Sequence, residues 1–267
     1  MKGKLIVIEG TDCSGKETQS KLLIEKLNNE GIKTEYFSFP NYSSPSGKIV
    51  GLSFLGKPYL AHELVEKEAD GLKEKLSDID PSIIDKVLNE LGESLSKGWF
   101  PESAPKVPAK VASLYYAADR LYNLPFIESK TESGINLILD RYFYSNMAHQ
   151  GGKLSTEKER TEMYDWLYDL EKNKLELPDS SIKLFLHMPT PYINLLKAGR
   201  DERLDENEKD AAYLENCEKA FLELVEKYNF ETIECTKNVV DGVSFENIKT
   251  KEEISGEIYE KVKKLMK

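Results

Sequence analysis

An apolar strand that runs directly into a glycine-rich loop constrains the fold of this chain more than any other feature. Residues 4–9 are mostly apolar, as in a buried parallel strand. The loop that follows consists of Gly10, Thr11, Asp12, Cys13, Ser14, Gly15, Lys16, Glu17 and Thr18. Its first eight residues match the pattern G-x-x-x-x-G-K-[ST] except at the last position, where Glu17 stands. A helix expected over 16–28 completes the strand, loop and helix order of a nucleotide-phosphate site.

The loop predicts that these nine residues bind the phosphates of ATP. Gly10 and Gly15 let the backbone curl so that successive N–H groups point at a phosphate, and the helix adds its positive dipole end. Lys16 is expected to reach the β- and γ-phosphates. Glu17 replaces the usual hydroxyl, and its carboxylate could either bind Mg²⁺ or repel the phosphates. We favour the metal-binding role.

Strands and helices alternate along the chain, which predicts an α/β fold with a parallel sheet in one domain over 1–267. The expected strands are 4–9, 33–39, 135–140, 181–187 and 230–234. Besides 16–28, the expected helices are 47–56, 109–129, 156–173, 190–198, 208–229 and 250–265.

Residues 59–108 form a charged segment that we interpret as a helical hairpin inserted into the domain. It holds a weak helical pattern over 62–76 and a helix start at Asp80-Pro81. The second helix carries one apolar face: Ile83, Ile84, Val87, Leu88, Leu91 and Leu95. We expect the hairpin to dock on its own protein, with a lid or an oligomer contact as alternatives.

Charge and composition restrict the class of protein. The net charge of −10 argues against broad nucleic-acid binding. No apolar run approaches the roughly 18 residues of a membrane-spanning helix. The three cysteines are scattered and lack metal-ligand spacing, as in a reduced cytoplasmic protein. We therefore expect a cytoplasmic enzyme that acts on small molecules, without a nucleic-acid or membrane partner.

A second cluster follows the predicted strand 135–140, which ends in Asp140 and Arg141. Ligands of open parallel sheets bind beyond the carboxyl ends of the strands, so both residues should lie near the glycine-rich loop. Asp140 can orient Mg²⁺ or its waters, and Arg141 can bind a phosphate through its planar fork.

Four segments resemble thymidylate kinases. Residues 140–151, D-R-Y-F-Y-S-N-M-A-H-Q-G, are similar to the family pattern D-R-Y-x-x-S-x-x-A-Y-Q-G. Residues 9–19 resemble E-G-x-D-x-x-G-K-[ST]-T-Q, and residues 115–120 resemble the L-F-A-A-D-R helix. Phe39-Pro40 resembles the F-P-x-R turn. The resemblance is collinear and covers most of the chain outside 59–108.

This resemblance implies a P-loop NTP hydrolase-type, three-layer α/β/α fold with a five-stranded parallel sheet in the order 2-3-1-4-5, a helical insertion and a homodimeric assembly. It also implies the transfer of the ATP γ-phosphoryl group to dTMP, giving dTDP, with Mg²⁺ present. The residues expected to bind substrate are Asp12, Phe39, Tyr116, Arg120, Arg141, Ser145, Asn146, His149 and Gln150.

The resemblance assigns separate roles to several of these residues. Asp12 would accept a hydrogen bond from the sugar 3′-hydroxyl, and Arg141 would bind the acceptor phosphate. Tyr116 would stack on thymine, and Arg120 would reach a carbonyl oxygen of the base. Ser145 and Asn146 would face the pyrimidine edge.

The resemblance implies that a lid segment over 198–208 supplies the remaining catalytic charge. Family members carry an arginine either in the phosphate loop or in the lid, and the loop position here is Cys13. Arg200 and Arg203 are therefore expected to close on the transferred phosphoryl group, together with Lys16 and Arg141 as catalytic residues.

Three departures from the family pattern keep alternatives open. Glu17 replaces the metal-side hydroxyl, His149 replaces a tyrosine that packs against the sugar, and Tyr42 replaces the arginine of the F-P-x-R turn. A kinase for another deoxynucleotide or a deoxynucleoside is the nearest alternative. A P-loop ATPase and an inactive homologue are the others.

Overall fold

Five parallel strands form one sheet in the computed structural model, which describes residues 2–97, 99–100, 106–198, 211–237 and 242–266. The strands are β1 (Leu5–Gly10), β2 (Thr34–Ser38), β3 (Asn136–Asp140), β4 (Ile182–His187) and β5 (Glu231–Glu234). Their order is β2-β3-β1-β4-β5, which confirms the predicted fold and sheet order. The central strand β1 is buried along its whole length, as its apolar sequence requires.

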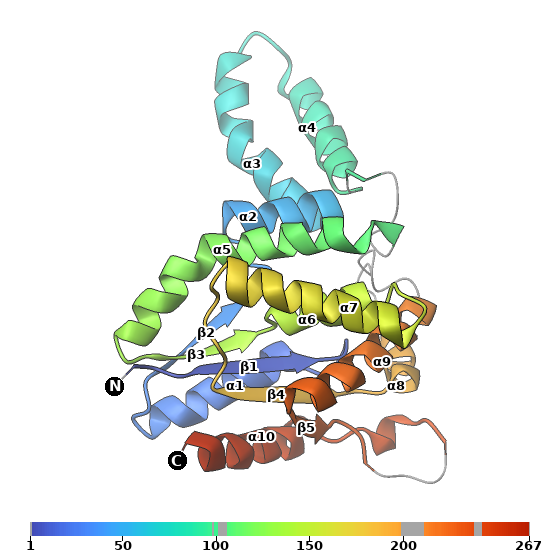
Figure 1. Cartoon of the computed structure of the whole chain (residues 1–267). Coiled ribbons are helices and arrows are strands. Elements are labelled where there is room, and N and C mark those ends of the chain that lie inside the picture. Colours follow the sequence, from blue (N-terminus) through green and yellow to red (C-terminus); the bar gives the residue numbers. More distant parts are fainter. Residues whose placement is uncertain (1, 98, 101–105, 199–210, 238–241, 267) are drawn as a thin grey trace.

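Helices cover both faces of the sheet and give three layers (Figure 1). One face carries α1 (Lys16–Asn29) and α10 (Lys251–Met266), and the other carries α5 (Ala109–Glu132), α6 (Phe143–Gly151) and α7 (Glu157–Tyr168). The other helices are α2 (Pro45–Ile49), α3 (Pro58–Lys75), α4 (Pro81–Leu95), α8 (Thr190–Ala198) and α9 (Ala211–Tyr228). In the described part of the chain, no helix is both long and apolar enough to cross a membrane.

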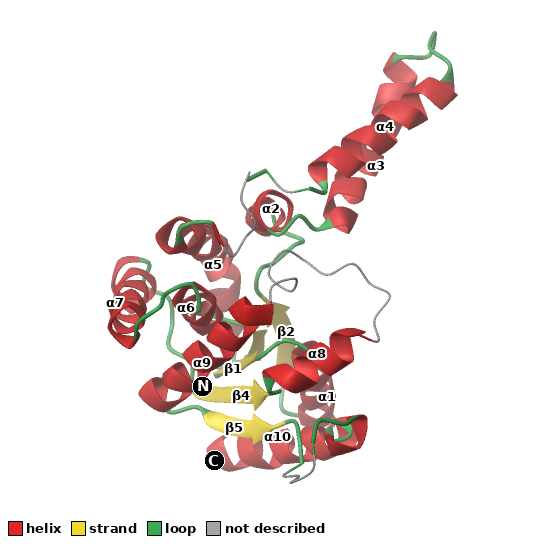
Figure 2. Cartoon of the chain, turned by 90° about the vertical axis from the view of Figure 1, so that its right-hand side faces the viewer, coloured by secondary structure: helices red, strands yellow, loops and turns green. Residues whose placement is uncertain are grey.

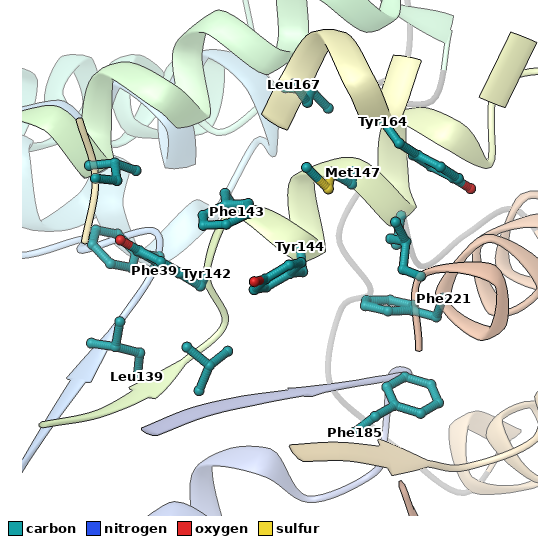
Figure 3. Close-up of a cluster of buried hydrophobic side chains, with 14 of the residues drawn as sticks. Phe39, Leu139, Tyr142, Phe143, Tyr144, Met147, Tyr164, Leu167, Phe185 and Phe221 are labelled. Carbon is teal, nitrogen blue, oxygen red and sulfur yellow. The ribbon is translucent and has the colours of Figure 1, made fainter. Parts of the chain in front are cut away.

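The two faces of the sheet build two separate apolar clusters, because successive strand residues point in opposite directions. Leu5 and Val7 of β1 pack toward α6, whereas Ile6 and Ile8 pack toward α1 and α10. Figure 3 shows the first cluster, in which aromatic rings from β4, α6 and α9 meet. This packing fixes the carboxyl ends of β1, β3 and β4 relative to one another, and these ends carry the candidate site.

Helix α6 was not predicted from the sequence. Its residues Phe143–Gly151 are mostly aromatic, polar or glycine, which are weak helix formers. Nearly every side chain of α6 is buried, and α6 packs against α5, α7 and α9. Tertiary packing therefore stabilises a helix that local propensity does not indicate.

The α3–α4 hairpin projects away from the rest of the molecule (Figures 1 and 2). Asp80 caps α4 as expected, accepting a hydrogen bond from the Ser82 amide at 2.9 Å. The expected apolar face of α4 is only partly used. Ile84 and Leu88 pack against α3, whereas three apolar side chains of the same helix are exposed: Ile83, Val87 and Leu91. The prediction that the whole face is covered was therefore wrong.

Candidate active site

A tight loop joins β1 to α1 and is bonded to the neighbouring strand β4. Thr11 donates from its amide to the carbonyl of Leu186 at 3.2 Å and from its hydroxyl to the carbonyl of Met188 at 2.7 Å. Gly10 has no room for a side chain, because a Cβ there would lie 2.6 Å from the Leu186 oxygen. Gly15 has a φ of 76°, in the region that favours glycine. The loop geometry therefore requires both glycines.

Lys16 folds back across this loop. Its Nζ donates to the carbonyl oxygens of Gly10 at 3.0 Å and Thr11 at 2.8 Å, and the residue is 8% exposed. Burial, together with repulsion from Arg141, lowers the pKa of Lys16 to about 8. The fold thus buries Lys16 in a place that disfavours its positive charge. A highly charged anion such as a polyphosphate would stabilise that charge.

Two cations from distant parts of the chain converge on Asp12. Arg141, just after β3, places Nη2 3.3 Å from Oδ1, and Lys197, near the end of α8, places Nζ 3.7 Å from Oδ2. Burial opposes ionisation, but Arg141 and Lys16 outweigh it and hold the pKa of Asp12 well below its usual range. The structure brings Asp12 and Arg141 together as expected. Lys197 was missed, because a single lysine on a helix carries no sequence signal.

A buried carboxylate, Glu9 of β1, supports the turn that carries Arg141. Glu9 is 0% exposed, and its Oε1 accepts hydrogen bonds from the amides of Tyr142 at 2.8 Å and Ser145 at 3.1 Å. The Ser145 hydroxyl donates to Glu9 Oε2. Sequence reasoning gave Glu9 no role, although a carboxylate inside an apolar strand is itself a signal.

Both carboxylates that were expected to bind metal influence the phenol of Tyr36. The Tyr36 hydroxyl donates to Asp140 Oδ2 at 3.0 Å, and burial together with the charges of Asp140 and Glu17 raises the pKa of Tyr36. Glu17 is mostly exposed and forms an ion pair with Lys21 at 2.5 Å. The described residues contain no cluster of three or more His, Cys, Asp or Glu side chains able to hold a metal ion.

The comparison with protein families identifies the family of this chain. The family model for thymidylate kinase matches residues 8–65 and 89–245. The chain belongs to the thymidylate kinase family. The match leaves out residues 66–88, which lie in α3, α4 and the turn between them.

Curated relatives and a solved structure agree with this assignment. The chain is 26% identical over 244 residues to thymidylate kinase from Schizosaccharomyces pombe, covering 90% of this chain and 88% of that protein. It is 24% identical over 240 residues to thymidylate kinase from Homo sapiens, covering 89% and 85%. The structure of thymidylate kinase from Candida albicans matches with a TM-score of 0.59 at 19% identity, over 98% of this chain and 92% of that one, and shows the same fold.

The residues expected to face the nucleoside include two buried oxygen acceptors. Asn146 donates to the carbonyl of Ser113 at 3.3 Å, whereas its Oδ1 has no hydrogen-bond partner among the described residues. The same holds for Oε1 of Gln150. Tyr116, on α5, lies edge-on to Phe54 with 5.8 Å between ring centroids. Both oxygens are thus buried acceptors that no described residue satisfies.

Two predicted substrate residues instead contact the protein interior. Arg120 is 2% exposed and pairs with Glu171, which is 0% exposed, through two hydrogen bonds, one of them 2.9 Å from Nε. Phe39 is buried in the core, where its ring lies 5.1 Å from Phe37 and 6.1 Å from Tyr142. The structure thus gives Phe39 a packing role and Arg120 a buried partner.

Of the remaining predicted residues, His149 is described in the structure and the lid arginines are not. His149 Nδ1 lies 3.1 Å from the hydroxyl of Tyr213, and the charge of His149 contributes to the low pKa of Asp12. Arg200 and Arg203, which were predicted to be catalytic, lie outside the described residues, as does the predicted lid from residue 199 onward.

The environment of His187, at the end of β4, predicts that the stability of the protein depends on pH. Burial opposes its charge, but hydrogen bonds to Glu218 at 2.8 Å and Glu234 at 2.9 Å outweigh it and raise the pKa of His187 above its usual 6.5. This stabilisation is present below pH 6.5 and is lost as the pH rises through the folded-state pKa.

Urea unfolding of the wild type and of His187→Asn, from pH 5 to pH 9, measures this effect. We expect the stability difference between the two proteins to shrink as the pH rises through this range. A difference that is constant with pH would show that His187 contributes only its packing.

Proposed function

We propose that this chain transfers the γ-phosphoryl group of ATP to dTMP, forming dTDP and ADP. The observation that carries the proposal is the meeting of the Lys16 loop with the Asp12–Arg141 pair at the carboxyl ends of β1 and β3. It supports a role for the loop in binding polyphosphate and for Arg141 as a second cation that would bind phosphate. Membership of the thymidylate kinase family supports the same reaction.

Each residue acts mainly by positioning or by neutralising charge, as phosphoryl transfer requires. The loop amides and Lys16 bind the phosphates of ATP. Arg141 binds the acceptor phosphate and aligns it with the γ-phosphate, whereas Asp12 accepts a hydrogen bond from the sugar 3′-hydroxyl. Because Asp12 holds Arg141 before substrate arrives, the guanidinium is already oriented toward the acceptor.

The nucleoside contacts are proposed from the family resemblance. Tyr116 offers an aromatic face to the base, and the unpaired Oδ1 of Asn146 can accept a hydrogen bond from the N3–H group of thymine. His149 and Gln150 complete the proposed pocket, which the resemblance assigns to the base and the sugar, whereas the Ser145 hydroxyl is already bonded to Glu9 and Arg141.

Mg²⁺ is the proposed metal cofactor, and the residues present fit it. Mg²⁺ sites in nucleotide-binding proteins use one or two carboxylates together with phosphate oxygens, so a cage of protein ligands is not needed. Asp140 supplies one fixed carboxylate oriented by Tyr36. Glu17 supplies a second, because its exposed ion pair with Lys21 contributes little energy and is readily exchanged. The metal would neutralise charge on the phosphates.

The lid arginines Arg200 and Arg203 are proposed to close on the transferred phosphoryl group. A homodimer is also proposed, since α5 exposes one apolar face: Val111, Leu114, Leu121, Tyr122 and Phe126. The proposed location is the cytoplasm, and its reducing conditions fit three cysteines that form no disulfide.

An acceptor panel tests the function. ADP formation from Mg-ATP is measured with dTMP, dUMP, dCMP, UMP, AMP, GMP, thymidine and no acceptor. We expect turnover to be fastest with dTMP. Faster turnover with another acceptor would move the proposal to that nucleotide or nucleoside. ADP formed equally well without acceptor would indicate an ATPase, and nucleotide binding without turnover would indicate an inactive homologue.

The substitution Glu17→Ser tests the unusual loop position. If Glu17 is a metal ligand, the Mg²⁺ concentration for half-maximal activity should rise by roughly tenfold. Lys21→Met is the matched control, because it removes the ion-pair partner and leaves the carboxylate. It should keep the Mg²⁺ dependence of the wild type or strengthen metal binding. A clear gain in activity for Glu17→Ser would show that Glu17 weakens the site.

A further inference from the structure

Glu9 is a buried carboxylate whose position is explained neither by the core nor by substrate contact. It lies in the central strand β1, is 0% exposed, and follows four apolar residues. Burial raises the pKa of Glu9 to about 7, although its hydrogen bonds and the charge of Arg141 favour the ionised form. A buried ionisable group of this kind is uncommon unless its partners require it.

The partners of Glu9 all belong to the turn that carries Arg141. Oε1 accepts from the amides of Tyr142 and Ser145, which lie at the start of α6, where backbone N–H groups have no partner within the helix. Oε2 accepts from the Ser145 hydroxyl. Glu9 therefore caps α6 from the neighbouring strand, in place of a capping side chain of the helix itself.

The Ser145 hydroxyl connects Glu9 to the guanidinium of Arg141. Because this hydroxyl donates its hydrogen to Glu9, its lone pairs are left to accept from Arg141 Nη1, which lies 3.4 Å away. Arg141 also has a φ of 68°, which is unfavourable for a residue other than glycine and needs support from its surroundings. Glu9 supplies that support by accepting a hydrogen bond from the amide of Tyr142, the residue that follows Arg141.

We propose that Glu9 is a positioning residue that, through Ser145 and the first amides of α6, holds Arg141 in the orientation that binds the acceptor phosphate. Asp12 fixes the opposite side of the same guanidinium at Nη2. The two carboxylates thus orient one cation from two directions. This proposal rests on the proposed function, since Arg141 must bind the acceptor phosphate for Glu9 to act through it.

The test compares a ligand that has the phosphate with one that lacks it. Calorimetric binding of dTMP and of thymidine is measured for the wild type and for Glu9→Gln. The amide keeps the shape of Glu9 but presents an NH₂ group to donors. We expect the dissociation constant for dTMP to rise by about tenfold and that for thymidine to stay within about twofold.

Two controls separate positioning from a general loss of structure. Glu223→Gln alters another hydrogen-bonded carboxylate, which pairs with Arg160 and Tyr164 of α7, and it should leave both dissociation constants unchanged. Ser145→Ala removes the hydroxyl that connects Glu9 to Arg141 and leaves the Glu9 carboxylate in place. It should weaken binding of dTMP more than that of thymidine, and it serves as the test should Glu9→Gln fail to fold.

A double-mutant cycle completes the test. In an Arg141→Ala background, Glu9→Gln should weaken dTMP binding no further, because the residue through which it acts is gone. An additive loss, or an equal loss for dTMP and thymidine, would overturn the positioning role. Failure of the wild type to bind or phosphorylate dTMP would instead overturn the proposed function. The same comparison would then be made with the preferred acceptor and its nucleoside.

Discussion

Replacing Lys16 with methionine is expected to lower kcat by roughly a thousandfold, the scale on which preorganised charges stabilise transition states. Lys16 is the buried cation at the centre of the phosphate-binding loop, where its Nζ bonds to the carbonyls of Gly10 and Thr11. Methionine keeps most of the side-chain volume and removes the charge. Steady-state ADP formation with saturating dTMP measures the loss.

The same substitution should leave the free energy of unfolding unchanged or raise it in the absence of nucleotide. Burial and the neighbouring Arg141 lower the pKa of Lys16, so the folded state disfavours the charge that it holds. Stability is therefore given up for function at this position, as at many active sites. Lys21→Met, one turn along α1, is the control and should retain turnover. Retained turnover in Lys16→Met would contradict the assigned role of Lys16.

The sequence predicts the centre of this molecule well because local and long-range signals agree there. The apolar run of β1, the glycines of the loop and the start of α1 each favour the observed structure. The same agreement at β3 places Asp140 at the end of the strand and Arg141 just beyond it. Topology then brings these residues to the loop, as the general rule for parallel sheets predicts.

The contacts that sequence reasoning missed depend on partners far along the chain. Glu9 bonds to Ser145, 136 positions away, and Lys197 reaches Asp12 across the sheet end. Neither pairing has a local spacing pattern. Helix α6 likewise forms because it is buried on most sides, against the weak helix propensity of its residues. The sequence indicates which residue types are available, and packing decides which of them meet.

Glu171→Leu is expected to destabilise the protein by about 3–5 kcal/mol, because it leaves Arg120 buried without a partner. Both side chains of this pair are almost fully enclosed, and Glu171 lies in the π-helical turn Asp169–Lys174 that follows α7. Urea unfolding measures the change. Asp165→Asn is the control, since its ion pair with Lys227 is solvent-exposed and should contribute less than about 1 kcal/mol.

The double variant Arg120→Met/Glu171→Leu decides between two roles for Arg120. If Arg120 serves the fold, apolar replacement of both partners should restore most of the lost stability and leave the affinity for dTMP unchanged. If Arg120 also reaches the base, as the family resemblance implies, the restored protein should bind dTMP at least about tenfold more weakly. Two bonds from the guanidinium already go to Glu171, and the residue is 2% exposed. We therefore expect restored stability with unchanged affinity, which would leave Asn146 and Tyr116 as the residues that recognise the base.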